Sequence, residues 1–372
     1  MAGLALLLII LGCVAFQYSK GSFVRSFGIF ATSIISVIIA FNYFEVLGGV
    51  VLSRSDQSSS ITPWAQPLAF LLIFIVSFGI CQTIAAQLLD KNVKLGTIAD
   101  KIGRSFLGLF IGLIFGGVIL VVLDMSPLSS NLPYERFSKT NINPDNPEKV
   151  FLNGDGFVAG WVSLASKGSL SGKKSFAAIH PEFINSSFLN RICFSKTVSI
   201  TTSANALDVP RKDGVWPAPD DVKNAESPQQ PVNVKSGHRL IIVRLGIKKS
   251  MLAKIGSFSL SQLRVICKNQ SQAESPLTGS SITAFAKGYM QSADLLKTQK
   301  LSDIITIKKD DITESTKWID FVFEVPNGYV PAIVQFKQNF IAELAKMSEP
   351  DQAPAITPFQ TDTETSPLDS SD

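Results

Sequence analysis

The chain has 372 residues, a formal net charge of +4 and 46% hydrophobic residues. This length leaves room for two domains of about 100–200 residues each. Its Lys and Arg residues are scattered, with no stripe and no cluster interleaved with aromatic residues, which argues against a nucleic-acid-binding protein. The average composition hides a sharp division, because nearly all the long apolar runs lie before Leu123 and the remainder is typical of a soluble protein.

Four apolar segments precede Asp124, and each is a candidate membrane span. A spanning helix needs about 20 mainly apolar residues, because the hydrocarbon core of a bilayer is about 30 Å thick and offers the backbone no hydrogen bonds. The last three segments contain no Lys or Arg, which is rare in helices of soluble proteins. We predict a four-helix transmembrane domain over residues 1–125, with spans at about 2–18, 27–47, 67–89 and 105–123.

A cleavable signal sequence is the alternative for the first segment, since Ile10-Leu11-Gly12-Cys13 loosely resembles a lipoprotein cleavage site. No basic residue precedes the segment, and no small-x-small site follows it in Phe16-Gln17-Tyr18-Ser19. We therefore expect the first segment to be retained as a span.

The loop charges predict the orientation of these spans, because Lys and Arg in short loops mark the cytoplasmic side. The second loop, from Ser53 to Gln66, holds only Arg54. The first and third loops are richer in basic residues and hold Lys20, Arg25, Lys91, Lys94, Lys101 and Arg104. Both termini are therefore expected on the non-cytoplasmic side, where Tyr43 and Trp64 fall near the membrane interface.

Two stretches of this region resemble the colicin V production protein (CvpA) family. Lys20-Gly21-Ser22-Phe23-Val24-Arg25 is similar to the basic, glycine-containing first loop of that family. The stretch from Leu95 to Gly112 is similar to the entry into its fourth helix and reads Leu-Gly-Thr-Ile-Ala-Asp-Lys-Ile-Gly-Arg-Ser-Phe-Leu-Gly-Leu-Phe-Ile-Gly. Ile111 departs from the family, whose members often carry a basic residue there. The resemblance implies a bacterial inner-membrane protein linked to toxin production, toxin export or envelope homeostasis, and it implies no defined reaction.

Polar residues within the spans are the next candidates for function, since ionisable groups in lipid are costly and tend to face a cavity or a partner. Glu45 is the one charged residue in the four spans, and Asn42 lies one turn before it. Gln82 lies in the third span. These three residues either stabilise helix packing through hydrogen bonds or form a proton or ion path, as in a channel or transporter.

Gly108, Gly112 and Gly116 recur every four residues in the fourth span, so they share one helical face. A face without side chains lets a neighbouring backbone approach closely, which favours helix association in lipid. Ser33, Ser36 and Ala40 offer small residues on the second span as a partner within the same chain. The alternative is a homo-oligomer formed through the fourth helix.

Beyond the spans we expect an exported, mainly β domain on the non-cytoplasmic side. Residues 126–149 are rich in Ser, Pro, Asn and Asp and are predicted to be a linker. The predicted order continues with a membrane-proximal helical or mixed segment (150–202), a Pro-rich loop (203–237), a β-sandwich part (238–345) and a disordered acidic tail (346–372).

Short runs of β-branched and aromatic residues predict the strands of this domain. They are residues 239–247, 262–267, 281–286, 303–307, 318–325 and 331–337, with a turn at Pro326-Asn327-Gly328. Their spacing suggests an antiparallel sandwich. The ending Phe321-Val322-Phe323-Glu324-Val325-Pro326, followed by an apolar strand, resembles bacterial extracytoplasmic immunoglobulin-like domains.

An enzyme is not expected, and neither is a cofactor or a metal. The chain has two His residues, His180 and His238, which are expected at the surface. Some relatives with this membrane bundle carry a trypsin-like protease, but Gly154-Asp155-Gly156 lacks the nucleophilic serine that such an enzyme places between Asp and Gly. No His, Cys and carboxylate spacing indicates a metal site.

Cys193 and Cys267 are the cysteines of the exported domain, and an oxidising compartment permits a disulfide between them. The alternative is two buried free thiols, which behave as small hydrophobic groups.

Three classes of function follow. The first is a non-enzymatic accessory or scaffold protein of toxin export or of the envelope, whose exported domain engages other envelope proteins or the cell wall. The second is a channel or transporter, and the third is an enzyme without a recognisable motif.

Overall fold

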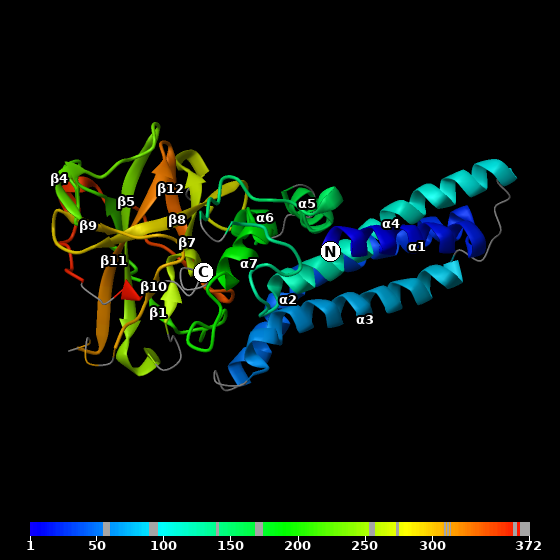
Figure 1. Cartoon of the computed structure of the whole chain (residues 1–372), viewed down its shortest axis with the longest axis horizontal. Coiled ribbons are helices and arrows are strands. Elements are labelled where there is room, and N and C mark those ends of the chain that lie inside the picture. Colours follow the sequence, from blue (N-terminus) through cyan, green and yellow to red (C-terminus); the bar gives the residue numbers. More distant parts are fainter. Residues whose placement is uncertain are drawn as a thin grey trace. The chain divides into compact units, whose positions relative to one another are not determined.

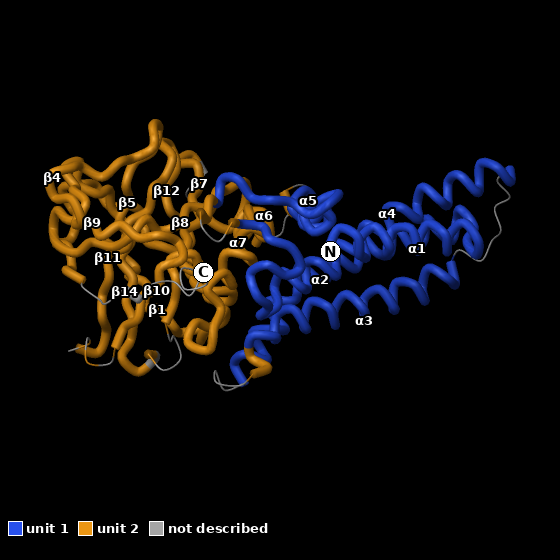
Figure 2. Tube along the Cα trace, viewed as in Figure 1, with its two compact units in different colours: residues 1–54, 63–137, 144–165 blue, residues 55–62, 138–143, 166–372 orange. Residues whose placement is uncertain are grey.

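The computed structural model describes residues 1–54, 60–88, 96–138, 141–167, 174–252, 257–272, 275–308, 310, 312, 314–359 and 363–364. The chain divides into two compact units (Figure 2). The helical unit comprises residues 1–54, 63–137 and 144–165, and the β unit comprises residues 55–62, 138–143 and 166–372.

Four long helices form most of the helical unit (Figure 1). They are α1 (Ala2–Lys20), α2 (Phe23–Arg54), α3 (Ala65–Leu88) and α4 (Thr97–Met125), and a short 3-10 turn, η1 (Thr62–Trp64), precedes α3. All four are long and apolar enough to cross a membrane. This confirms the prediction of four apolar helices, although α2 and α4 extend beyond the predicted spans. Lys91 and Lys94 lie outside the described residues.

Helix α4 is central to this arrangement, because it packs against α1, α2 and α3. Helix α2 packs most extensively against α3, through edge-to-face contacts such as Phe41 with Phe70, whose ring centroids are 4.8 Å apart. Phe115 of α4 makes similar contacts with Phe74 and Phe78 of α3. Edge-to-face aromatic pairs of this kind add directional stabilisation to apolar packing.

A fifth helix, α5 (Gly154–Lys167), belongs to the helical unit as far as Ala165. It follows a one-turn 3-10 helix, η2 (Phe151–Asn153), in which Leu152 and Asn153 have φ angles of 58° and 46°. Left-handed backbone is uncommon for residues other than Gly and turns the chain sharply. Val150 is buried with Ala2, Leu6 and Leu120, so the segment before α5 is fixed to α1 and α4. Residues 126–137 and 144–149, predicted to be a linker, also belong to this unit.

The β unit begins with the short helices α6 (Phe176–Ile179) and α7 (Phe183–Arg191) and continues as strands. The strands are β1 (Leu207–Asp208), β2 (Val215–Pro217), β3 (Lys223–Asn224), β4 (Ser227–Pro231), β5 (His238–Lys248), β6 (Phe258–Ser259), β7 (Leu263–Asn269), β8 (Ser281–Met290), β9 (Leu295–Thr298), β10 (Ile304–Ile305), β11 (Thr316–Pro326), β12 (Tyr329–Phe336), β13 (Phe340–Glu343) and β14 (Thr363–Glu364). The predicted mainly β character is confirmed, and each predicted strand overlaps an observed one.

Eleven described strands form one half-barrel sheet, whose principal order is β1-β5-β11-β8-β7-β12-β13. Strands β5 and β11 pair antiparallel over their full length, from His238 opposite Pro326 to Lys248 opposite Thr316. Strand β12 follows β11 after a two-residue turn at Gly328 (φ 82°), yet β12 pairs with β7 and β13 instead of β11. Strands β8 and β7 therefore lie between β11 and β12 in the sheet, although β11 and β12 are joined by that short turn.

Large apolar side chains from this sheet and from β6 pack into one core. Phe321 and Phe323 of β11, Phe336 of β12, Tyr289 of β8 and Phe258 of β6 are all buried in one cluster. Their alternation with outward-facing residues follows the period of two expected for strands.

Two sequence predictions for the β unit are wrong. Residues 203–237, expected to be a long Pro-rich loop, contain the strands β1 to β4, and Trp216 is buried opposite Ile242 of β5. Residues 346–359, expected to be disordered, end with Phe359 fully buried against Tyr289. In both segments a few large apolar residues anchor a chain that is otherwise polar. Of the remaining tail, the described residues 363–364 form β14, and residues 360–362 and 365–372 lie outside the description.

Candidate functional site

The glycine face of α4 receives α1 and not α2. A β-carbon built on Gly112 would lie 2.6 Å from Cα of Ile10, and one on Gly108 would lie 2.9 Å from Cα of Val14. A β-carbon on Gly116 would collide with the side chain of Leu6. The three glycines therefore permit backbone contact between α4 and α1, as small residues do in membrane helix packing.

The prediction that the second span packs against the glycine face of α4 is wrong. Ser33, Ser36 and Ala40 of α2 are fully buried, but the two serine hydroxyls donate to carbonyls of their own helix, those of Phe30 and Thr32. The α4 face is filled within the chain by α1.

The intramembrane polar residues do not form one site. Asn42 is exposed and donates to the Ile38 carbonyl of its own helix at 2.8 Å, and Glu45 is partly buried one turn later. Gly48 of α2 packs against Gln66 of α3, which sets the register of these antiparallel helices. From this register, Gln82 lies about 20 Å from Glu45 along the helix axes. With this register, Asn42, Glu45 and Gln82 do not line a single proton or ion path.

A buried ionic cluster lies at the C-terminal end of α4, at residues that sequence reasoning did not assign to a site. The Asp155 carboxylate is fully buried at the start of α5 and forms an ion pair with Arg136 at 3.5 Å. The phenol of Tyr134 donates to Asp155 Oδ2, and Arg136 donates to the Tyr134 oxygen at 2.5 Å. Asp124, also fully buried, lies near the same phenol. Two carboxylates, a guanidinium and a phenol thus share one enclosed space.

The electrostatics of this cluster favour a neutral phenol. Burial raises the pKa of Tyr134, and the negative charges of Asp124 and Asp155 raise it further, while Arg136 opposes them. Tyr134 therefore acts as a hydrogen-bond donor, not as a base. From the sequence alone, Gly154-Asp155-Gly156 shows only that a protease motif is missing. Asp155 also stands at the start of an apolar helical segment, and a carboxylate in that position is the feature from which a buried ion pair could have been predicted.

The opposite end of α4 is tied to the first loop. Asp100 accepts the backbone N–H of Phe23 at 2.8 Å and pairs with Arg104 at 3.6 Å, and Arg104 donates to the Gly21 carbonyl. These contacts hold the N-terminal end of α4 beside the loop between α1 and α2.

The cysteines of the β unit are both free thiols, so the disulfide considered above is not formed. Cys193 follows α7 and its Sγ contacts the Ser302 carbonyl at 3.2 Å. Cys267 faces the apolar core from β7, and burial raises its pKa. The two side chains thus have different surroundings, and both behave as buried hydrophobic groups.

His180, expected at the surface, is buried beside the sheet. Its Nδ1 lies 3.5 Å from Gln335 Nε2, and its ring contacts those of Phe176 and Phe183. Gln335 also accepts from Arg264 at 2.8 Å and donates to the Ile179 carbonyl at 2.7 Å. These bonds hold α6 on the outer face of β7 and β12. His238 is half-buried at the start of β5.

Among the described residues, no group of three or more His, Cys, Asp or Glu side chains is arranged to hold a metal ion. Comparison with known proteins found no matching protein family, no matching curated protein and no matching solved structure.

Proposed function

We propose that this protein is a non-enzymatic accessory or scaffold protein of the bacterial inner membrane, similar in role to the CvpA family. The observation that supports it is the division of the chain into four apolar helices packed around α4 and a separate mainly β unit. The helices serve as an anchor. Both termini lie on the non-cytoplasmic side, in keeping with the basic residues gathered near Asp100 and Arg104.

In this proposal the β unit works outside the cytoplasm, where it engages envelope proteins or the cell wall in toxin export or envelope homeostasis. Its apolar core and its buried hydrogen bonds suit a stable recognition module. A relationship with immunoglobulin-like domains remains a prediction from the end of β11.

The interior of the helical unit favours a membrane anchor over a channel or transporter. A groove runs between α1, α2 and α4, and its lining is almost entirely apolar, with Gln17 as the polar exception. A channel or transporter remains the second candidate. It predicts that Glu45→Gln changes ion flux or membrane potential in vesicles, whereas an anchor predicts no change.

The experiment that tests the scaffold proposal is crosslinking in intact cells. A photoreactive residue at exposed Lys346 of the full chain should capture specific envelope partners, identified by mass spectrometry. The matched probe at exposed Thr97, on the opposite side of the membrane, should not capture them. Identical captures from both positions would contradict the proposed topology and role.

A further inference from the structure

Helix α5 carries large apolar side chains on its exposed side as well as on its buried side. Val158, Ala159 and Val162 are buried, while Trp161 and Leu164 on the other side are 43% and 68% exposed. A helix at a water surface would carry polar residues on that exposed side. Lys167, in the last turn, is the first charge after Asp155. Large apolar side chains on the exposed side of a helix favour an apolar environment on that side too.

The contacts of α5 place it at the depth of the bilayer. Arg104 and Asp124 lie about 30 Å apart along α4, which equals the thickness of the hydrocarbon core. Gly117 and Ile114, which contact α5, lie about 10 Å and 15 Å inward from Asp124. Both Gly154 and Val158 pack against Gly117, and Val158 and Trp161 share an apolar pocket with Ile114.

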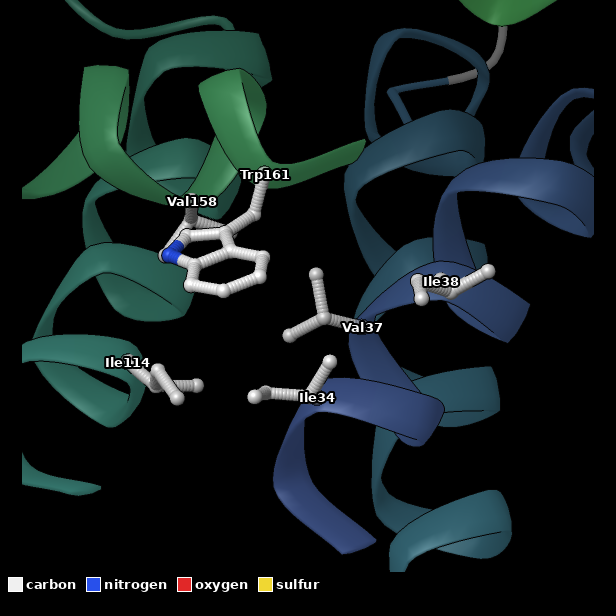
Figure 3. Close-up of a pocket in the computed structure, with 6 residues that line it drawn as sticks. All are labelled: Ile34, Val37, Ile38, Ile114, Val158 and Trp161. Atoms are coloured by element: carbon white, nitrogen blue, oxygen red, sulfur yellow. The ribbon is translucent and has the colours of Figure 1, made fainter. Parts of the chain in front are cut away.

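Helix α2 gives the same depth independently. Phe30 of α2 contacts Phe110 of α4, with ring centroids 6.1 Å apart, and both helices run outward from their basic ends. Val37 therefore lies level with Gly117. Figure 3 shows the Trp161 indole reaching from α5 into the space between Ile114 of α4 and Val37 of α2. The side chains that line this pocket are all apolar.

The one acidic side chain of α5 is compensated. Asp155 is paired with Arg136 and accepts the Tyr134 phenol, so the helix enters an apolar environment without an unpaired charge. An isolated carboxylate there would be very costly. Gly117 has no side chain, which lets α5 pack closely against α4, since a β-carbon at this position would collide with the Gly154 carbonyl oxygen.

We propose that α5 is a re-entrant helix embedded in the outer leaflet of the membrane, and that Trp161 and Leu164 form a surface for lipid acyl chains. This inference rests on the proposed function, because it assumes that α1 to α4 span the bilayer. The helix extends the anchor beyond the four spans.

The experiment places a thiol-reactive fluorophore at Leu164→Cys in the full chain, reconstituted in phospholipid vesicles. Cys13 and Cys81 are replaced by Ala; Cys193 and Cys267 remain, because they are 2% and 0% exposed. Ile119→Cys, on exposed α4 surface, is the membrane control, and Asn131→Cys, in the exposed loop after α4, is the aqueous control. Acyl-chain-attached nitroxides should quench positions 164 and 119 to a similar extent and leave position 131 bright.

A membrane-impermeant maleimide provides the second measurement, in cells. It should label Asn131→Cys and spare both Leu164→Cys and Ile119→Cys. Labelling of Leu164→Cys at the rate of Asn131→Cys, with Ile119→Cys still protected, would overturn the re-entrant helix and leave the spans intact. Labelling of Ile119→Cys as well would overturn the proposed membrane topology itself.

Gly117→Leu, added to each of the single-cysteine variants, tests whether α5 packs against Gly117. The larger side chain should displace α5, so that Leu164→Cys loses its quenching and becomes labelled while Ile119→Cys stays protected. The parent without an added cysteine reports folding, because loss of the β unit would expose Cys193 and Cys267. Unchanged quenching at position 164, with that parent unlabelled, would contradict the contact between Gly117 and α5.

Discussion

The two units pack by opposite means. In the helical unit, α4 meets α1 where side chains are missing, at Gly108, Gly112 and Gly116. In the β unit the same close contact is achieved by large side chains, such as Phe321, Phe323 and Trp216, each at most 1% exposed. Helices in lipid gain little by hiding apolar surface from one another, so backbone proximity matters. In water, burial of apolar area supplies most of the stability.

Charge burial differs between the units as well. Both units bury an aspartate that is paired with an arginine, Asp155 with Arg136 in the helical unit and Asp320 with Arg244 in the β unit. The β unit in addition buries Lys337 and Lys268 against backbone carbonyls. Burial disfavours the charged form of an amine, so it lowers the pKa of both lysines. The comparison therefore predicts that the β unit carries the alkaline pH dependence of stability.

The largest expected effect is the removal of that dependence by Lys337→Met. Burial lowers the pKa of Lys337 to about 7, against about 10.4 for an unfolded lysine. Between these values the unfolded chain binds a proton that the native protein does not, so the free energy of unfolding rises with pH. The total gain in the free energy of unfolding is about 5 kcal/mol. Urea unfolding followed by tryptophan fluorescence at pH 7 to 10 should show a flatter profile for the variant.

Burial also lowers the pKa of Lys268, to about 8. We expect this lysine to cause the pH dependence of stability that remains in the Lys337→Met variant. Lys346→Met, at an exposed position, is the control and should leave the profile unchanged. An equally steep profile for Lys337→Met would contradict the account.

The second effect concerns the ion pair of the helical unit. Arg136→Met leaves Asp155 buried without its cation and should destabilise the unit by about 3–5 kcal/mol. The double variant Arg136→Met/Asp155→Leu should recover much of this loss, because no charge remains buried. Thermal unfolding in detergent measures both. Lys248→Met, which removes an exposed pair with Asp208, should cost about 0–1 kcal/mol. Equal effects of the two single variants would remove the distinction between buried and exposed pairs.

The sequence predicted those elements that a local pattern defines. Apolar runs located α1 to α4, and β-branched runs located β5, β7, β8, β11 and β12, because hydrophobic periodicity reflects burial directly. It did not predict which helix fills the glycine face, since several spans carry small residues. It also missed Trp216 and Phe359 as core residues, because single anchors within Pro-rich or acidic segments form no periodic pattern.

The third effect tests one of these anchors. Phe359→Ala should destabilise the β unit by about 3 kcal/mol, because the ring is fully buried against Tyr289 and its removal leaves a cavity. Chemical unfolding of the full chain measures the change. Pro358→Ala, at the exposed neighbouring position, should change stability by less than about 0.5 kcal/mol. A Phe359→Ala protein as stable as the parent would mean that residues 346–359 contribute nothing to the core.

The smallest expected effect returns to the glycine face. Gly112→Val adds a side chain where a β-carbon would already lie 2.6 Å from the Ile10 backbone, so α1 must move away. Overpacking of this kind costs about 1–3 kcal/mol. Gly12→Val is the matched control, because a β-carbon there meets nothing within 4 Å and the change in helix propensity is the same. Thermal unfolding in detergent should separate the two variants.

Crosslinking then shows whether the contact that Gly112→Val disturbs lies within one chain or between two chains. Cysteine pairs joining α1 to α4 within one chain should crosslink in the parent and in Gly12→Val and lose efficiency in Gly112→Val. Dimers linked through α4 would instead indicate that a second copy competes with α1 for the face. Because α1 already fills this face, we expect the crosslinked product to remain monomeric. Efficient dimer formation from the glycine face of the parent would establish the homo-oligomer instead.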